Sequence, residues 1–447
     1  MITASRRTLL AGVALAGLSG CASNNSAIAD PIDHYVAAFY YAYPIYEFAR
    51  TAWASAGPSA QRPVNRFNQI MHRRTLTDHT GRNITTPNND TVYSSARLDL
   101  TNGPLLAEFP TLEDRYFSVA FMNAYTDNFA YVGTRATNGV GGRALIVGPR
   151  WEGVAPDGVR VIRSQTDDVW MLARILVEGP EDLPAANAAQ DHIRFLEVPD
   201  AAPLPVRPTS SDDLENFLAV ANAMLARAPL TDPVGRRAAQ FADTGLRAGD
   251  IDAWASISQA QRDCWTSAAA RAMETLRGGF TLRGQTIAGW HYPPPGVGAP
   301  GDADDVRAAV ALSGLAALEA VEATYARADD DNNGEPLNGA RAYTLTIPAN
   351  VPAGAFWSLS MYQLESDGRL FFTQNPLQRF AIGDRTTGLR PNADGSYTIA
   401  LQHAQPADTS NWLPTPAGPF VVTFRIYLPQ PPILTGDWRL PAVTRVA

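Results

Sequence analysis

The strongest constraint on the fold is a change of hydrophobic periodicity that occurs twice along the chain. Apolar or alternating runs separated by turn residues follow one another from Val92 to Val177, which is typical of an antiparallel sheet. From Glu181 the apolar residues recur at helical spacing, and from Arg341 the two-residue alternation returns. We therefore predict an α+β protein with two antiparallel β-rich modules, sandwich-like or jelly-roll-like, and a helical segment between them.

Capping signals and apolar spacing place several helices. Asp30 precedes Pro31 as a cap precedes the first residue of a helix. Ser258 and Gln261 have the spacing of a capping box. Helical spacing also extends over residues 185–198 and 305–328. The resulting division of the chain is an export signal at 1–20, a β-rich domain at 31–205, a helical segment at 206–334 and a β-sandwich domain at 335–447.

The first residues have the pattern of an export signal. Arg6 and Arg7 precede an apolar run that is too short for a membrane-spanning helix, and the sequence LSGC ends that run at Cys21. The arginine pair resembles a twin-arginine signal, and LSGC resembles a bacterial lipoprotein box. We expect lipidation of Cys21 and an exported protein of the cell envelope, facing the periplasm or at the outer membrane, that meets the membrane only through its lipid. The alternative is an ordinary secretory signal in which the cysteine stands by chance.

Charge and motif content exclude several classes of protein. The net charge is −8, and no run of lysine or arginine supplies the basic surface that nucleic acid requires. The sequence has no nucleophile elbow, zinc-binding helix, phosphate-binding loop or dinucleotide fingerprint. The segment from Asp329 copies half of a calcium loop, but Ala340 stands where the closing glutamate belongs. We therefore expect no metal and no cofactor, and the sequence leaves the oligomeric state open.

The block TPNNDTVYSS, at residues 86–95, concentrates polar side chains immediately before a predicted strand. Asn88, Asn89 and Asp90 readily close turns on their own backbone, so one interpretation is a structural corner. The other interpretation is a catalytic and binding site. In that site Asp90 accepts a proton, Tyr93 donates a hydrogen bond or stacks, and the two asparagines contact the ligand.

A second group of polar and aromatic residues lies in the last hundred residues. Two-residue alternation in FWSLSMYQL places Trp357 on one face of a strand and Tyr362 on the other. Rings combined with amide and guanidinium groups suit a polar, ring-bearing ligand such as a sugar. The candidate ligand-binding residues of this kind are Trp357, Tyr362, Asn411, Trp412, Arg425 and Tyr427. The alternative is that both tryptophans fill a core and that Arg425 pairs with an acid such as Asp394.

Several blocks of the sequence resemble two families of unknown function. TPNNDT, RYFSVAF, FWSLSMY, NPLQRF, DGSYTIAL, NWLPTP and FRIYLP occur in the order typical of the families called domain of unknown function 1254 and domain of unknown function 1214. The resemblance covers about residues 31–205 for the first family and 335–447 for the second. It implies the two-module architecture and assigns no reaction. Asn123 stands where many relatives carry an aspartate, which makes Asp90 and Asp127 the candidate carboxylates in its place.

Two hypotheses about function follow. The first is a metal-independent hydrolase or lyase that acts on a small polar or glycan-like molecule in a cleft between the β modules, with Asp90 as base and Tyr93 or Arg425 stabilising developing negative charge. The second is a lipoprotein of the cell envelope that binds such a ligand without changing it. If both sequence blocks serve one site, Asp90 or Tyr93 must lie near Trp412 or Arg425.

Overall fold

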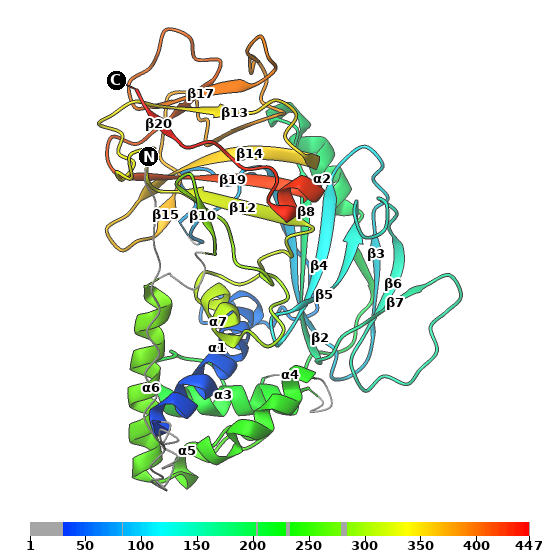
Figure 1. Cartoon of the computed structure of the whole chain (residues 1–447). Coiled ribbons are helices and arrows are strands. Elements are labelled where there is room, and N and C mark those ends of the chain that lie inside the picture. The colour runs from blue at the N-terminus through cyan, green and yellow to red at the C-terminus, as the bar shows by residue number, and fades with distance from the viewer. Residues whose placement is uncertain (1–29, 83, 203, 229–232, 279–283, 447) are drawn as a thin grey trace, which may run out of the picture.

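The structure is a computed structural model that describes residues 30–446, apart from 83, 203, 229–232 and 279–283. The predicted export signal and Cys21 lie outside the described residues. Of the helices that the structure describes, none is long and apolar enough to cross a membrane. Two groups of strands lie next to each other, and a group of helices lies beneath them (Figure 1).

The first β module has, within the described residues, two sheets packed face to face. One sheet has the strand order β1-β2-β8-β4-β5 and the other the order β7-β6-β3-β9. The strand bounds are Met71–Arg73 (β1), Thr91–Asp99 (β2), Leu105–Phe109 (β3), Phe117–Asn123 (β4), Asn128–Gly133 (β5), Gly142–Val147 (β6), Arg160–Arg163 (β7), Asp168–Leu176 (β8) and Arg194–Glu197 (β9). Val92, Phe121 and Ile146 come from three different strands and share one core, so the module is a sandwich.

The second β module repeats this arrangement. Its sheets have the strand orders β10-β11-β12-β19-β14-β15, with β16 also paired to β14, and β18-β17-β13-β20. The strand bounds are Thr286–Ile287 (β10), Trp290–His291 (β11), Ala323–Ala328 (β12), Tyr343–Ile347 (β13), Ala353–Leu364 (β14), Leu370–Phe371 (β15), Ala381–Gly383 (β16), Tyr397–Gln402 (β17), Trp412–Pro414 (β18), Phe420–Pro429 (β19) and Thr444–Arg445 (β20). Trp357 lies in the core between the sheets and Tyr362 on the opposite side of β14, which confirms the predicted alternation. The α+β class is also confirmed.

Most of the helices form a third part with its own core, whereas α2 packs into the first β module and α8 into the second. Their bounds are Pro31–Ala56 (α1), Leu183–Asp191 (α2), Leu214–Ala226 (α3), Pro233–Arg236 (α4), Ala253–Ser256 (α5), Gln259–Arg277 (α6), Asp304–Leu312 (α7) and Pro431–Thr435 (α8), with 3-10 helices at Pro180–Asp182 (η1) and Arg237–Thr244 (η2). Asp30 caps α1, and Ser258 and Gln261 form the predicted capping box of α6. Helix α1 packs against α3, α6 and α7, so it joins the middle helices although it precedes the first β module in sequence (Figure 1).

Two predicted helices are wrong in part, because strand pairing replaces them. Over 305–328 the helix α7 ends at Leu312, and the left-handed φ values of Leu315 and Ala316, 64° and 53°, are incompatible with its continuation. Ala323–Ala328 then forms β12 and pairs with β19. Over 185–198 the helix α2 ends at Asp191, and β9 pairs with β3. In both places a tertiary hydrogen-bond ladder overrides a moderate helix propensity.

The two β modules meet through the outer faces of β2, β8 and β4 on one side and of β12, β19 and β14 on the other. Each outer face carries a row of residues paired in register: Tyr93, Arg174 and Ser118 in the first module, and Tyr325, Arg425 and Ser358 in the second. Tyr116, Phe356 and Tyr427 belong to a buried aromatic cluster that takes residues from both modules. We call these two rows, together with residues 86–90, the junction.

Candidate functional site

Residues 86–90 form a strained corner at the junction. The Asn88 side chain accepts a hydrogen bond of 2.5 Å from the Asp90 backbone N–H, which is the turn predicted from the sequence. The Asn89 amide donates to the Thr77 carbonyl at 2.5 Å, within the same module. Thr86 has a φ of 55°, a conformation that β-branched residues rarely adopt. Surrounding contacts must therefore hold this corner in place.

Asp90 joins the two modules. Its carboxylate is 4% exposed and accepts hydrogen bonds from the Ser358 hydroxyl at 2.6 Å and from the Arg385 guanidinium at 2.9 Å. Arg385 lies over the ring of Phe356, with its guanidinium carbon 4.1 Å from the ring centre. Each oxygen of Asp90 is thus engaged by the second module, which is the geometry of a structural ion pair rather than of a free general base.

Arg425 contacts the corner directly, so residues of the two sequence blocks lie next to each other. Its guanidinium donates to the hydroxyls of Ser360 and Tyr362 at 2.6 and 2.5 Å, and at 3.3 and 3.4 Å to two carbonyl oxygens of the corner. The Tyr362 hydroxyl itself donates to the Pro87 carbonyl at 2.6 Å. Within the described residues no carboxylate forms an ion pair with Arg425. Asp394, the acid suggested from the sequence, bonds to its own turn instead.

Tyr427 extends the contact between the modules. Its hydroxyl accepts a hydrogen bond of 2.6 Å from the Asn88 amide, and its ring stacks on Phe356 with 4.1 Å between ring centres. The ring of Tyr116 meets it edge-on at 5.2 Å. Burial, reinforced by the neighbouring phenols, raises the pKa of Tyr427 well above its ordinary value. The phenol therefore stays neutral at physiological pH.

Arg174 brings a third guanidinium to the junction, after those of Arg385 and Arg425. It is 6% exposed, donates to the Ala316 carbonyl at 3.0 Å and lies 5.6 Å from the ring centre of Tyr93. Its Nη1 atom, and the hydroxyl of the adjacent Ser118, have no hydrogen-bond partner among the residues that the structure describes. Buried polar groups in native proteins are matched by protein, water or ligand, so this place favours a polar group from outside the chain.

Two tyrosines connect Arg174 with solvent and with Arg425. Tyr93 and Tyr325 keep partial exposure although they stand within the sheets. Burial raises the pKa of the Tyr325 phenol, while Arg174 and Arg425 both oppose that rise. Both guanidinium groups therefore act on one ring, and the two arginines belong to one electrostatic site.

Three residues next to this site have a strained backbone. Ala316, which accepts the hydrogen bond from Arg174, has a φ of 53°, and Leu428, which follows Tyr427, has a φ of 51°. Thr86, with its φ of 55°, is the third residue of this kind. Strain of this kind costs about 1–3 kcal/mol per residue and is found preferentially at functional sites.

Three residues predicted from the sequence lie away from the junction. Trp357 packs in the core of the second module. Trp412 is fully buried and donates its indole N–H to the Gln402 carbonyl at 2.8 Å. The Asn411 amide accepts from and donates to the backbone of Arg390, both at 2.8 Å. These contacts are structural. The other candidate residues from the sequence, among them Asp90, Tyr93 and Arg425, lie at the junction, and Trp357, Trp412 and Asn411 do not.

The sequence-based prediction missed Arg174 and Ser118. The signal for Arg174 was present, because a guanidinium stands in the middle of the apolar run at 169–177. The same anomaly marks Arg97 in the run at 92–100. A charged residue inside a strand that is otherwise apolar requires a partner, and the search for that partner would have led to the junction.

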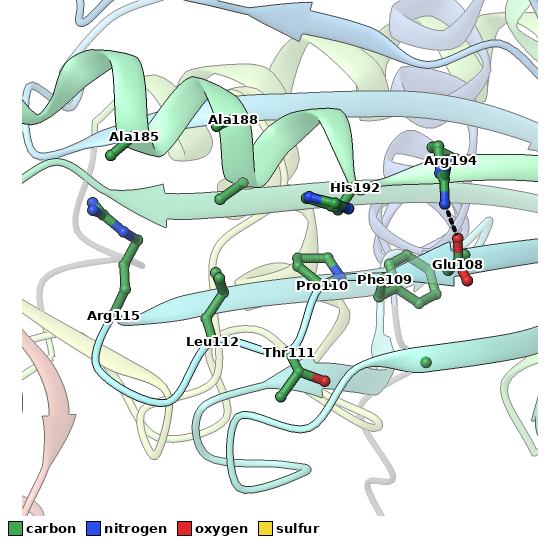
Figure 2. Close-up of a pocket in the computed structure, with 12 residues that line it drawn as sticks. Glu108, Phe109, Pro110, Thr111, Leu112, Arg115, Ala185, Ala188, His192 and Arg194 are labelled. Carbon is green, nitrogen blue, oxygen red and sulfur yellow. Dashed lines mark hydrogen bonds and ion pairs between the residues drawn. The ribbon is translucent and has the colours of Figure 1, made fainter.

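A groove of about 570 Å³ lies elsewhere on the first module, between β3 and α2 (Figure 2). Arg115 stands near one end of it and Arg194 near the other. Each is already paired, Arg115 with Asp182 at 2.5 Å and Arg194 with Glu108. The groove contains none of the residues predicted from the sequence, and its paired arginines offer a ligand less charge than the junction does.

Among the described residues, one group of side chains has the composition of a metal site. The donor atoms of His291, Asp329 and Asp330 lie within 4.8 Å of one another. Asp329 is also bonded to His291 at 2.8 Å and to Arg327 at 3.2 Å. The Arg327 guanidinium already binds the Asp329 carboxylate and would compete with a metal ion for it. We therefore assign no function to this group.

A solved structure shares the architecture. The crystal structure of the VPA0106 protein from Vibrio parahaemolyticus is 23% identical, covers 93% of this chain and 100% of its own, and superimposes with a TM-score of 0.72. This similarity establishes a common fold. An uncharacterized protein from Burkholderia cenocepacia is 13% identical over 95% of this chain and 91% of its own, with a TM-score of 0.46. No curated protein matches the chain.

Two family models match the sequence. Protein of unknown function (DUF1254) matches residues 67–197, and Protein of unknown function (DUF1214) matches residues 322–431. The first region supplies β2, β4 and β8, and the second supplies β12, β14 and β19, so the two matched regions contain the facing strands of the junction. The chain therefore belongs to the paired families DUF1254 and DUF1214.

Proposed function

We propose that the protein is an exported lipoprotein that binds a small anionic molecule at the junction of its two β modules. The observation that carries the proposal is Arg174, which is buried and has a guanidinium nitrogen without a partner in the described part of the chain, next to a serine hydroxyl in the same condition. A carboxylate or phosphate matches such a group, because its oxygens accept parallel N–H bonds from a guanidinium.

The surroundings of Arg174 indicate a ligand that is also polar and ring-bearing or hydroxylated. Tyr93 and Tyr325 offer partly exposed rings for stacking and hydroxyls for hydrogen bonding. Arg425 adds positive charge without an ion-paired acid among the described residues. A small sugar acid, or another glycan-like molecule with an acidic group, combines the features that these side chains recognise.

A metal-independent hydrolase or lyase is the second candidate, and Tyr93 is the observation in its favour. A guanidinium that neutralises a substrate carboxylate eases removal of a proton from the neighbouring carbon, and a phenol beside it is placed to transfer that proton. Tyr93 lies next to Arg174 and keeps partial exposure. Asp90 suits the role of base less well, because Ser358 and Arg385 hold both its oxygens.

Thermal-shift measurements with small anions test the binding proposal. Acetate, glucuronate, phosphate and the neutral control glucose are added to the purified mature chain. We expect an anion to raise the melting temperature of the wild type, glucose to have no effect, and Arg174→Met to lose the response. Arg194→Met is the matched control, because it removes an arginine from the groove between β3 and α2. Loss of the response in Arg194→Met and its retention in Arg174→Met would place binding in the groove and end the proposal.

Turnover separates the two candidates. The anion that binds best is incubated with wild type and with Tyr93→Phe, and the products are analysed by mass spectrometry. Binding without any product favours the binding protein. Product formation that disappears in Tyr93→Phe, while the thermal shift remains, favours the enzyme.

The proposed location rests on the sequence around Cys21. We expect the protein to fractionate with membranes because of lipid on this cysteine, and Cys21→Ser to release it into the soluble fraction. Ser19→Thr, which keeps the cysteine, serves as the control. Unchanged membrane association of Cys21→Ser would contradict the lipoprotein assignment without affecting the binding site.

A further inference from the structure

Arg97 lies on the outer face of β2, four residues beyond Tyr93, and is a buried arginine in addition to Arg174 of β8 and Arg425 of β19. Its side chain is 3% exposed, and Nη2 donates to the Thr51 hydroxyl of α1 at 3.1 Å. Its Nε and Nη1 atoms have no hydrogen-bond partner within the described residues, and no carboxylate there forms an ion pair with it. The proposed function does not use this residue.

Aromatic contacts compensate the Arg97 charge only in part. Its guanidinium carbon lies 3.6 Å from the ring centre of Trp170 and 5.4 Å from that of Phe48. Cation–π attraction is weaker than the cost of burying an unpaired ion, and burial lowers the pKa of Arg97 to about 9. In proteins, a buried cation of this kind is normally paired with an anion.

Arg97 and Arg174 lie on the same face of one sheet, on the neighbouring strands β2 and β8. Arg174 stands opposite Tyr93 in the ladder, so the Cα atoms of the two arginines are separated by four residues along the strand and one strand spacing across it, about 14 Å in total. Ser95 and Leu172, which are paired with each other, stand between them on the same face. Both keep partial exposure and neither carries charge. Two cations thus flank an uncharged, solvent-accessible stretch of the sheet.

We infer that the ligand of the junction carries two anionic groups, one bound by Arg174 and the other by Arg97, with an uncharged middle part lying over Ser95 and Leu172. The class of compound that fits is a linear dicarboxylic acid or a sugar acid with a second acidic group. This inference rests on the proposed function, because Arg174 supplies the first binding position.

Paired dicarboxylates and monocarboxylates of equal length test the inference. Adipate, suberate and sebacate are titrated into the purified mature chain by calorimetry, and their monomethyl esters serve as matched ligands with one charge. We expect at least one diacid to bind the wild type about tenfold or more tighter than its monoester, because a charge-assisted hydrogen bond is added. In Arg97→Met this advantage should disappear while monoester affinity stays unchanged, and Arg97→Lys should restore part of it.

The outcomes distinguish failure of the inference from failure of the proposed function. If the ratio of diacid affinity to monoester affinity is the same in wild type and in Arg97→Met, the second binding position is overturned. Arg174 then remains as the first binding position. Loss of both diacid and monoester binding in Arg174→Met, with loss of only the diacid advantage in Arg97→Met, supports both positions. Absence of binding for every carboxylate in the wild type would overturn both. Arg97→Met is used only if its circular dichroism spectrum matches that of the wild type, and Arg97→Gln replaces it otherwise.

Discussion

The two ends of the outer face of β2 and β8 differ in whether an arginine is paired with acids. At one end Asp99 and Asp168, which are paired in register, hold Arg227 at 2.7 and 2.6 Å. At the other end Arg174 has no ion-paired acid among the described residues and leaves one nitrogen without a hydrogen bond. The first end is an ion cluster within the chain, although Asp99 Oδ2 has no hydrogen-bond partner among the described residues. The second end has charge available for a molecule from outside.

A charge with a structural role and a charge available for binding thus differ in their neighbouring groups and not in their degree of burial. The Arg227 side chain is 11% exposed and Arg174 is 6% exposed. Burial is therefore nearly the same at both ends. Only the balance of charge differs, and substitutions can test the difference directly because the two ends share one sheet.

The largest expected effect is that of Arg227→Met. Removal of this arginine leaves two buried carboxylates side by side, and breaking a buried pair in this way typically costs about 3–5 kcal/mol of unfolding free energy. Arg174→Met removes no ion-pair partner and should cost less than about 1 kcal/mol. Urea unfolding of both variants measures the contrast. Equal losses would mean that Arg174 has a partner within the folded chain.

Asp90→Asn should have the next largest effect. The substitution removes the charge that Arg385 contacts across the junction and weakens the bond from Ser358, and hydrogen bonds to charged groups contribute about 1.5–3 kcal/mol. We expect a loss of about 2 kcal/mol in urea unfolding. Asn89→Ala, whose amide bonds within one module, is the control and should cost about 1 kcal/mol or less. An unchanged stability of Asp90→Asn together with lost ligand binding would restore Asp90 as a site residue.

Much of this architecture could be predicted from sequence, because the relevant signals are local. Alternation predicted the strands of both modules and the two faces of β14, and the residue types at 88–90 predicted a turn. In the segment 313–328, where the predicted helix is wrong, residues 323–328 form a strand because β19 offers a ladder far away in sequence. Local propensity carries no information about such a partner.

The candidate site was harder to predict because its distinguishing property is a buried arginine, Arg174, with a nitrogen that has no hydrogen-bond partner among the described residues. The sequence placed Arg425 and Tyr427 in a group with Trp412 and Asn411, since all combine rings with polar groups. The structure separates them, because Trp412 and Asn411 bond to nearby backbone. Whether a given arginine is paired depends on residues from other elements, which only the tertiary structure brings together.

Asp168, in the ion cluster with Asp99 and Arg227, should contribute a measurable pH dependence to stability, and Asp384 beside Arg385 also has a pKa raised by burial to about 6. Burial raises the pKa of Asp168 to about 6, against the opposing effect of Arg227, while the unfolded chain has an ordinary value near about 3.9. The folded state then binds more protons between these values, so the stabilising contribution is complete below about pH 4 and is lost as the pH rises to about 6. The slope is about 1.4 kcal/mol per pH unit. The difference in unfolding free energy between wild type and Asp168→Asn, followed over this range, measures it, and a flat difference would contradict the raised pKa.

Arg97→Met should have the smallest effect on the protein without ligand, and its sign is informative. The substitution loses a cation–π contact worth about 2 kcal/mol and the bond to Thr51, but it also removes a buried charge whose desolvation costs several kcal/mol. Because methionine keeps most of the volume, we expect a change within about 1 kcal/mol, toward higher stability. Arg97→Ala is the control and should destabilise through lost packing against Trp170. A loss of several kcal/mol in Arg97→Met, similar to that in Arg227→Met, would mean that the Arg97 charge is balanced inside the protein, and the contrast between the two ends of the face would then be limited to Arg174.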